Sequence, residues 1–107
     1  MNNSMLKRKG DLLDIEQIYA LEKMVFGSEA WTLDMLKIEL LGIYNSSTVL
    51  IEENGLILSY LIYRRLLHEY HILNLGVLPS RQKEGIGSII LKDFLNQLKN
   101  ISTVFLE

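Results

Sequence analysis

Residues 82–88, Gln-Lys-Glu-Gly-Ile-Gly-Ser, place two glycines and several polar residues just ahead of an apolar pattern with helical spacing. Gly85 and Gly87 have no side chain, so another molecule can approach the backbone closely at these positions. The first N–H groups of a helix have no intrahelical partner, and they attract anions such as phosphate. The segment is not a Walker A loop, because Ser88 directly follows Gly87, and it lacks the third glycine of a dinucleotide fingerprint. The spacing predicts an anion-binding helix N-terminus.

A strand and a helix must flank this segment to position it. The preceding strand is predicted over residues 70–77, from an apolar β-forming run that ends before Pro79. The following helix is predicted over residues 85–99, because apolar residues recur there every three to four positions. Its apolar stripe consists of Ile86, Ile89, Ile90, Phe94, Leu95 and Leu98.

The rest of the chain predicts an α+β fold. An edge strand is expected over residues 5–9, a helix over 11–26 with Asp11 or Asp14 as its N-cap and Gly27 at its end, and a helix from Thr32 to Gly42. Strands over residues 48–53 and 56–66 are joined by Asn-Gly, a strong hairpin signal, and a last strand spans residues 102–107. The predicted order is β-α-α-β-β-β-α-β, a mixed, mostly antiparallel sheet flanked by helices, whose last strand joins in parallel by a right-handed crossover.

Composition limits the function classes. With 107 residues the chain forms at most one domain, residues 1–107, and the absence of cysteine rules out disulfides, zinc–thiolate sites and a cysteine nucleophile. A net charge of −2 gives no general footprint for nucleic acid. We found no membrane-length apolar run and no signal-peptide core, so a cytoplasmic location is expected.

Several segments together carry a family resemblance. The hexamer Gln82–Gly87 resembles the acetyl-CoA pyrophosphate loop of the GCN5-related N-acetyltransferases, the GNAT superfamily. Three further segments resemble one branch of this superfamily, the RimI-type ribosomal-protein-alanine N-acetyltransferases. These segments are Phe26 with Ala30-Trp31-Thr32, the run Asn74–Pro79, and the final Phe105-Leu106-Glu107. Ala30 stands where that branch usually has proline, and Gly76 where it often has alanine.

The resemblance implies acetyl-CoA as cosubstrate, no metal, and direct attack by the acceptor amine. The pantetheine arm would lie along Leu75, Gly76 and Val77, where a backbone N–H would stabilise the developing oxyanion. Glu107 matches the family's general base. The pyrophosphate would be held by the loop and first helical turn, which comprise Gln82, Lys83, Glu84, Gly85, Ile86, Gly87 and Ser88. Arg81 and Lys83 either add positive charge there or are solvated loop residues.

Four further polar residues lie in or next to the predicted strand over residues 70–77. Glu69 is a second candidate for the base, although an exposed turn residue is the favoured interpretation. His68 and His71 lie three residues apart without a carboxylate–histidine cluster, so they are expected to be partly exposed histidines rather than metal ligands. Asn74 either contacts the acceptor backbone or satisfies an irregularity of its strand.

The family pattern continues beyond Glu107 with an asparagine loop, a tyrosine-bearing helix and two strands, so we expect an incomplete domain. The tyrosines of this chain lie outside the matching motif, so we assign none of them the role of general acid, and little or no turnover is expected from the 107-residue form. The first functional hypothesis is acetylation of the N-terminal alanine of a small-subunit ribosomal protein. The alternatives are a GNAT enzyme for another peptide or small amine, and a non-catalytic acetyl-CoA-binding domain. An open sheet edge also favours a homodimer by strand pairing.

Overall fold

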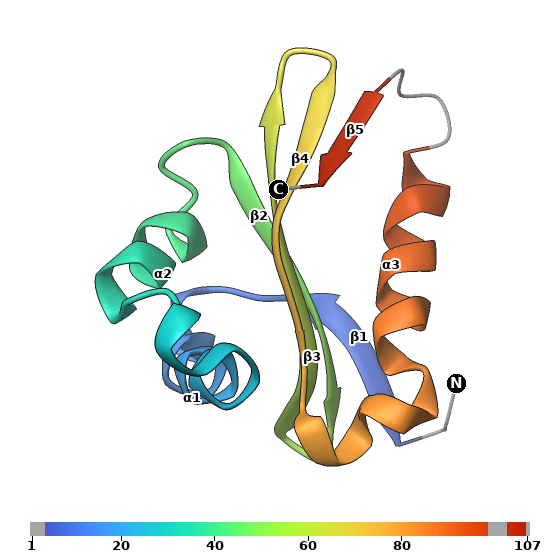
Figure 1. Ribbon diagram of the computed structural model, residues 1–107. Coiled ribbons are helices and arrows are strands. Elements are labelled where there is room, and N and C mark those ends of the chain that lie inside the picture. Colours follow the sequence, from blue (N-terminus) through green and yellow to red (C-terminus); the bar gives the residue numbers. More distant parts are fainter. Residues whose placement is uncertain (1–3, 99–102, 107) are drawn as a thin grey trace.

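The computed structural model describes residues 4–98 and 103–106, which form one five-stranded sheet with helices on both faces (Figure 1). The strands are β1 Met5–Lys9, β2 Ser46–Glu53, β3 Leu56–Leu66, β4 Glu69–Val77 and β5 Thr103–Leu106. The α-helices are α1 Ile15–Phe26, α2 Leu33–Leu40 and α3 Ile86–Gln97, and 3₁₀ turns span Leu12–Asp14, Gly27–Glu29 and Pro79–Glu84. The predicted order of strands and helices is confirmed.

The sheet follows the chain, with the order β1-β2-β3-β4-β5. The first four strands are antiparallel, and β5 pairs with β4 in parallel, as a strand that follows a crossover helix should. The β2–β3 hairpin turns at Asn54 and Gly55, whose φ angles of 52° and 86° suit the predicted Asn-Gly turn.

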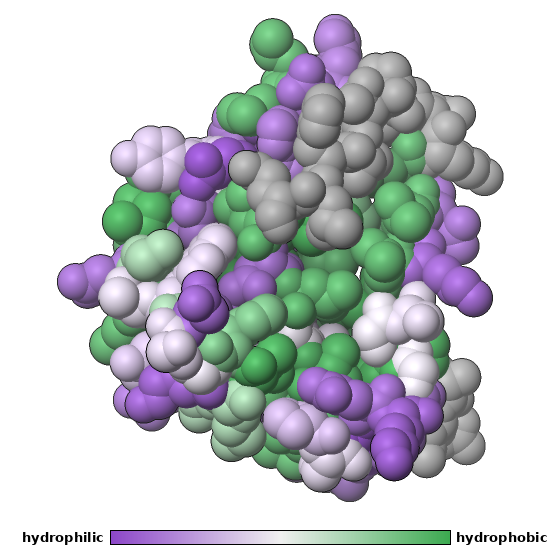
Figure 2. Space-filling view, viewed as in Figure 1, coloured by the Kyte–Doolittle hydropathy of each residue, from purple (hydrophilic) through white to green (hydrophobic). Residues whose placement is uncertain are grey.

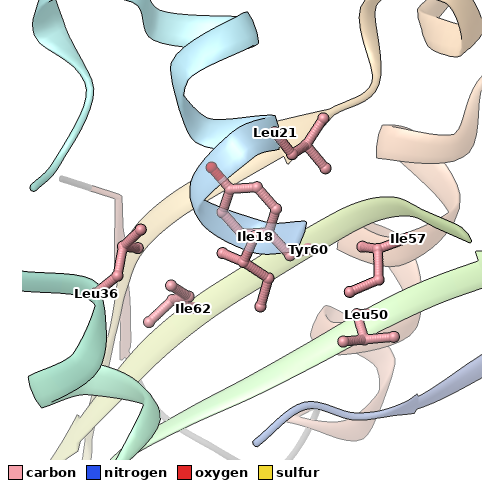
Figure 3. Close-up of a cluster of buried hydrophobic side chains, with 7 residues drawn as sticks. All are labelled: Ile18, Leu21, Leu36, Leu50, Ile57, Tyr60 and Ile62. Carbon is pink, nitrogen blue, oxygen red and sulfur yellow. The ribbon is translucent and has the colours of Figure 1, made fainter. Parts of the chain in front are cut away.

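Two apolar clusters hold the helices on opposite faces of this sheet. One joins α1 and α2 to the sheet through Ile18, Leu21, Leu36, Leu50, Ile57, Tyr60 and Ile62 (Figure 3). The other joins α3 to the opposite face through Ile51, Leu58, Leu61, Ile72, Ile86, Ile90 and Phe94. Because residues along a strand alternate between faces, β3 contributes to both clusters. Its central residues are accordingly buried on both sides.

The start of the first helix shows how local sequence sets the geometry. Asp11 and Asp14 both take part in the cap: Asp11 Oδ1 accepts from the Leu13 N–H at 2.9 Å, and Asp14 Oδ2 accepts from the Asp11 N–H at 2.9 Å. This capping box opens a 3₁₀ turn that leads into α1. The second predicted cap is also present, with Thr32 accepting from the Met35 N–H at 3.2 Å.

The predicted helix at residues 85–99 begins later and is preceded by more structure than expected. A 3₁₀ turn over Pro79–Glu84 occupies most of the predicted loop, and Gly87 lies inside the first turn of α3. Gly85, with a φ of 77°, is the left-handed residue that separates the two helical segments. Between β4 and α3, only Leu78 and Gly85 therefore lie outside a strand or a helical turn.

A partly buried ion pair between β1 and the helix start makes stability depend on pH. Arg8 donates to both oxygens of Asp14, at 2.8 and 3.0 Å, and these bonds hold the pKa of Asp14 below its usual value. The stability that this ion pair adds is complete above the pKa of Asp14 in the unfolded chain, about 4, and is lost as the pH falls through the lower pKa of Asp14 in the folded chain. Asp14→Asn should thus lower the free energy of unfolding at pH 7 by about 1–3 kcal/mol and by much less at pH 3.

Denaturant titrations of the parent and the variant at pH 7, 5, 4 and 3 measure this difference. Glu16→Gln, which neutralises an exposed carboxylate on the same helix, is the matched control and should change little at any pH. An Asp14→Asn penalty that stays constant down to pH 3 would contradict the assignment.

Candidate cofactor edge on strand β4

Strand β5 covers only the first part of the outer edge of β4. The parallel pairing runs from Glu69 opposite Thr103 to Ile72 opposite Leu106, and within the described residues it ends there. Figure 1 shows β5 beside the first half of β4 alone. From Leu73 to Val77, the outer edge of β4 has no partner strand in the described part of the chain.

The β4 backbone changes at the point where this pairing stops. The register passes from Ile62 opposite Asn74 to Tyr63 opposite Ile72, so Leu73 is the extra residue of a β-bulge. As a result, Leu73 packs on the α1–α2 cluster, and the side chain of Asn74 also reaches α1. The bulge therefore directs two successive side chains to the same face.

Beyond the bulge, the hydrogen-bonding pattern fixes which backbone groups face outward. The Leu78 N–H donates to the Leu58 carbonyl at 2.8 Å, and the Gly76 carbonyl accepts from Ser59 Oγ at 2.8 Å, so Leu78 and Gly76 are turned toward β3. Because these orientations alternate along an antiparallel strand, Leu75 and Val77 direct their N–H and C=O groups away from β3. We refer to Leu75–Val77 and its outward backbone groups as the open edge.

Two side chains satisfy groups of this open edge. Gln82 Nε2 donates to the Val77 carbonyl at 3.2 Å, and Asn74 Oδ1 accepts from the Leu75 N–H at 3.1 Å. Neither bond was predicted from the sequence. An outward-facing backbone group can exchange a side-chain partner for a ligand without leaving a polar group unpaired.

The N-terminus of α3 adjoins the open edge. The N–H groups of Ile86, Gly87 and Ser88 form its first turn, and Gly85 supplies no side-chain cap. A Cβ atom added to Gly87 would lie 3.0 Å from Val77 Cγ2, whereas one at Gly85 would meet nothing within 4 Å. Gly87 therefore lets the helix approach the strand, and the space beside Gly85 is open.

The charges around this turn are largely paired. Arg81 donates to Glu53 at 3.0 Å and also to Glu84, and it holds the pKa of Glu53 below its usual value. Lys83 and Ser88 are exposed. Positive potential at this site thus comes mainly from the helix N-terminus and Lys83, because Arg81 is neutralised by two carboxylates.

The surface between the α1–α2 layer and α3 is mostly hydrophobic on the face shown in Figure 2. In the described part of the chain we find no group of three or more histidine and acidic residues that could hold a metal, and no helix long and apolar enough to cross a membrane. An elongated ligand with an anionic end fits this arrangement: its polar groups would bond to the open edge, and its anion would lie at α3.

A buried carboxylate lies behind the open edge. Glu22 of α1 is 1% exposed and accepts three hydrogen bonds: from the Tyr60 hydroxyl, from Asn74 Nδ2 at 2.5 Å and from the Trp31 N–H at 2.8 Å. Burial, together with the bond to Glu22, raises the pKa of Tyr60 well above its ordinary value. Tyr60 is thus a buried hydrogen-bond donor to Glu22.

The remaining predicted residues lie elsewhere. Glu69 contacts His71 at 3.1 Å at the start of β4, six residues from Leu75, or about 20 Å along an extended strand. Glu69 is exposed as expected, but it is the first residue of β4 and not part of the turn before it. Glu107, the predicted base, lies outside the described residues. The sequence did not single out Glu22, because one glutamate in an amphipathic helix carries no distinctive signal.

Residues 12–107 match the Acetyltransferase (GNAT) family. No curated protein sequence matches the chain.

Solved structures share the fold. The chain is similar to the ribosomal-protein-S18-alanine N-acetyltransferase of Escherichia coli, with a TM-score of 0.86, 19% identity and coverage of 95% of this chain and 65% of that one. The loading GNATL domain of CurA from Lyngbya majuscula gives a TM-score of 0.82, 16% identity and coverage of 94% and 61%. The PaiA N-acetyltransferase of Thermoplasma acidophilum, in complex with coenzyme A, gives a TM-score of 0.74 and 13% identity, with coverage of 91% of this chain and 73% of that one. The chain thus spans less than two thirds of the first two structures, and at these identities the likeness is one of fold.

The open edge also depends on a close contact behind it. Gly76 lies opposite Tyr60, and a Cβ atom at residue 76 would lie 2.6 Å from the Tyr60 ring. The RimI-type branch often has alanine at this position, and the methyl group of an alanine here would collide with the Tyr60 ring. Gly76→Ala should therefore lower the free energy of unfolding by about 1–3 kcal/mol, measured by denaturant titration.

Tyr60→Leu is the companion variant, because it removes the ring that the new methyl group would meet. The double variant should therefore lose less free energy of unfolding than the sum of the losses measured for the two single variants. Strict additivity would mean that Gly76 is needed for another reason.

Proposed function

We propose that this chain, which belongs to the Acetyltransferase (GNAT) family, binds acetyl-CoA and takes part in transferring its acetyl group to the N-terminal amine of a protein. The observation that carries the proposal is the open edge of β4 running directly to the N-terminus of α3. We propose as acceptor the N-terminal alanine of a small-subunit ribosomal protein.

Each part of the edge has a role in this proposal. The outward backbone groups of Leu75 and Val77 would bond the amide groups of the pantetheine arm as a neighbouring strand would. The first-turn N–H groups of α3 would hold the pyrophosphate, with Lys83 nearby and with the Ser88 hydroxyl as a further donor. When bound, acetyl-CoA supplies the acetyl group as an activated thioester.

The chain itself must stabilise negative charge and remove a proton. The Leu75 N–H lies farther from the anion site than Val77 and faces the open edge, so it is the amide we assign to the thioester oxygen. Glu107 is proposed as the base that takes the proton of the acceptor amine, directly or through water. Within the described residues, the pairing of β4 with β5 ends where Leu106 lies opposite Ile72.

The ribosomal acceptor is supported by the Escherichia coli neighbour, which acts on the alanine of ribosomal protein S18. The segments Phe26 to Thr32 and Asn74 to Pro79 resemble the same branch. In this structure these two segments meet, since the Trp31 N–H and Asn74 both donate to Glu22.

A second candidate acceptor is favoured by a pocket on the α2 side. This pocket, of about 260 Å³, is lined by Trp31, Met35, Ile38, Glu39, Tyr44, Arg64 and Leu73. Most of its lining is apolar, and Arg64 is held by Glu39 at 2.5 Å. Leu73 is the bulge residue beside the open edge, so a peptide or amine with a large apolar side chain next to its amine is the alternative.

Calorimetric titration with acetyl-CoA tests the cofactor assignment. The double variant Gly85→Glu, Gly87→Glu introduces two carboxylates at the α3 N-terminus and should weaken binding at least tenfold, or about 1.4 kcal/mol, by occupying the space and repelling phosphate. Gly42→Glu is the matched control, because Gly42 has a similar φ of 73° and follows α2 on the opposite side of the sheet. Equal weakening by the control, or a folded parent that does not bind, would reject the site.

Peptide titrations in the presence of CoA separate the two acceptors. Peptides that differ only in an N-terminal alanine or leucine should favour alanine if the ribosomal assignment holds. If the pocket takes the side chain, leucine should gain about fourfold per buried methylene, and Met35→Trp should cancel that gain without weakening the alanine peptide. Preference for leucine with cancellation by Met35→Trp would replace the first acceptor by the second.

A further inference from the structure

Asn74 connects the buried carboxylate to the open edge. Its Nδ2 donates to Glu22 Oε1 at 2.5 Å, and its Oδ1 accepts from the Leu75 N–H at 3.1 Å. The bulge at Leu73 brings this side chain to the α1 face, while the Leu75 N–H points to the outer edge. One side chain thus touches both the interior and the backbone group that faces the ligand space.

The orientation of the Asn74 amide follows from its two partners. A carboxylate oxygen accepts hydrogen bonds, and a backbone N–H donates them. The NH₂ group must therefore face Glu22, and the carbonyl oxygen must face Leu75. Glu22 cannot easily turn away, because the Tyr60 hydroxyl and the Trp31 N–H hold its two oxygens in a site that is 1% exposed.

We propose that Asn74 is a positioning residue that holds the place of the thioester oxygen at the Leu75 N–H, and that Glu22 fixes it there. The inference rests on the proposed function, since it names a ligand of the same edge. In the free chain, Asn74 Oδ1 accepts from the Leu75 N–H, so this backbone N–H is hydrogen-bonded and its direction is fixed. An acetyl thioester displaces this oxygen, whereas CoA, which has no acetyl carbonyl, leaves it in place.

The exchange has a measurable consequence. In the parent chain, the acetyl oxygen replaces an existing acceptor, so its bond to Leu75 adds little and the two ligands should bind with similar affinity. In Asn74→Ala the Leu75 N–H has lost this acceptor. Acetyl-CoA then supplies one and CoA does not, so the ratio of the CoA dissociation constant to that of acetyl-CoA should rise about three- to tenfold.

Tyr60→Phe is the matched control. It removes another donor to the same Glu22 carboxylate. Glu22 is still held by the Trp31 N–H on its other oxygen and still accepts from Asn74 Nδ2, so the bond between Asn74 and Leu75 is kept. Its ratio of dissociation constants should equal that of the parent. A role of Asn74 limited to packing or to satisfying Glu22 would give the two variants the same result.

A second measurement uses the parent chain and so does not depend on the variant folding. In a ¹⁵N-labelled sample, acetyl-CoA should shift both the Leu75 amide signal and the Asn74 side-chain NH₂ signals. CoA should leave the Asn74 signals near their positions in the free chain.

The outcomes are distinguishable. An unchanged ratio in Asn74→Ala, an equal rise in Tyr60→Phe, or identical Asn74 shifts with both ligands would overturn the place-holding role while leaving the proposed function standing. A folded parent that binds neither acetyl-CoA nor CoA would overturn the proposed function, and this inference with it.

Discussion

The Glu22 carboxylate is the constraint on which the arrangement of the site depends. A carboxylate buried in an apolar cluster is costly unless its oxygens are hydrogen-bonded. Here the donors come from three separate elements: Tyr60 from β3, Asn74 from β4 and the Trp31 N–H from the segment between α1 and α2. Satisfying one buried group therefore fixes the first helix, the segment before the second and the strand with the open edge relative to one another.

The same geometry explains two irregularities of the sheet. A regular strand would send Leu73 and Asn74 to opposite faces, and the bulge at Leu73 instead lets Asn74 reach Glu22. The Tyr60 ring, which carries the hydroxyl that reaches Glu22, occupies the space that a Cβ atom at residue 76 would need. The glycine at residue 76 is thus required by the tyrosine opposite, although the sequence suggested only a mild departure from the family pattern.

Patterns within short segments could be predicted, and contacts between segments could not. The element order, the Asn-Gly hairpin and the caps at Asp11 and Thr32 depend on neighbouring residues, and all are present. The predicted anion-binding site depends on Gly85 and Gly87, and both glycines lie at the start of α3. Nothing in the sequence indicated that Glu22 is buried or that Arg81 pairs with Glu53, because both depend on residues far apart in the sequence that the fold brings together.

The hydrogen bonds that Asn74 and Gln82 make at the open edge limit how much of a ligand's binding free energy this edge can supply. An unpaired strand edge invites association with other strands, and here Asn74 and Gln82 satisfy two of its groups with side chains of the same chain. A ligand that pairs with the edge must displace these partners, so it exchanges hydrogen bonds and gains little net free energy from them. Charge at the α3 N-terminus and burial against the hydrophobic surface beside the edge must then supply most of the affinity. The edge itself contributes alignment, since its outward groups accept only a ligand whose polar groups match their spacing.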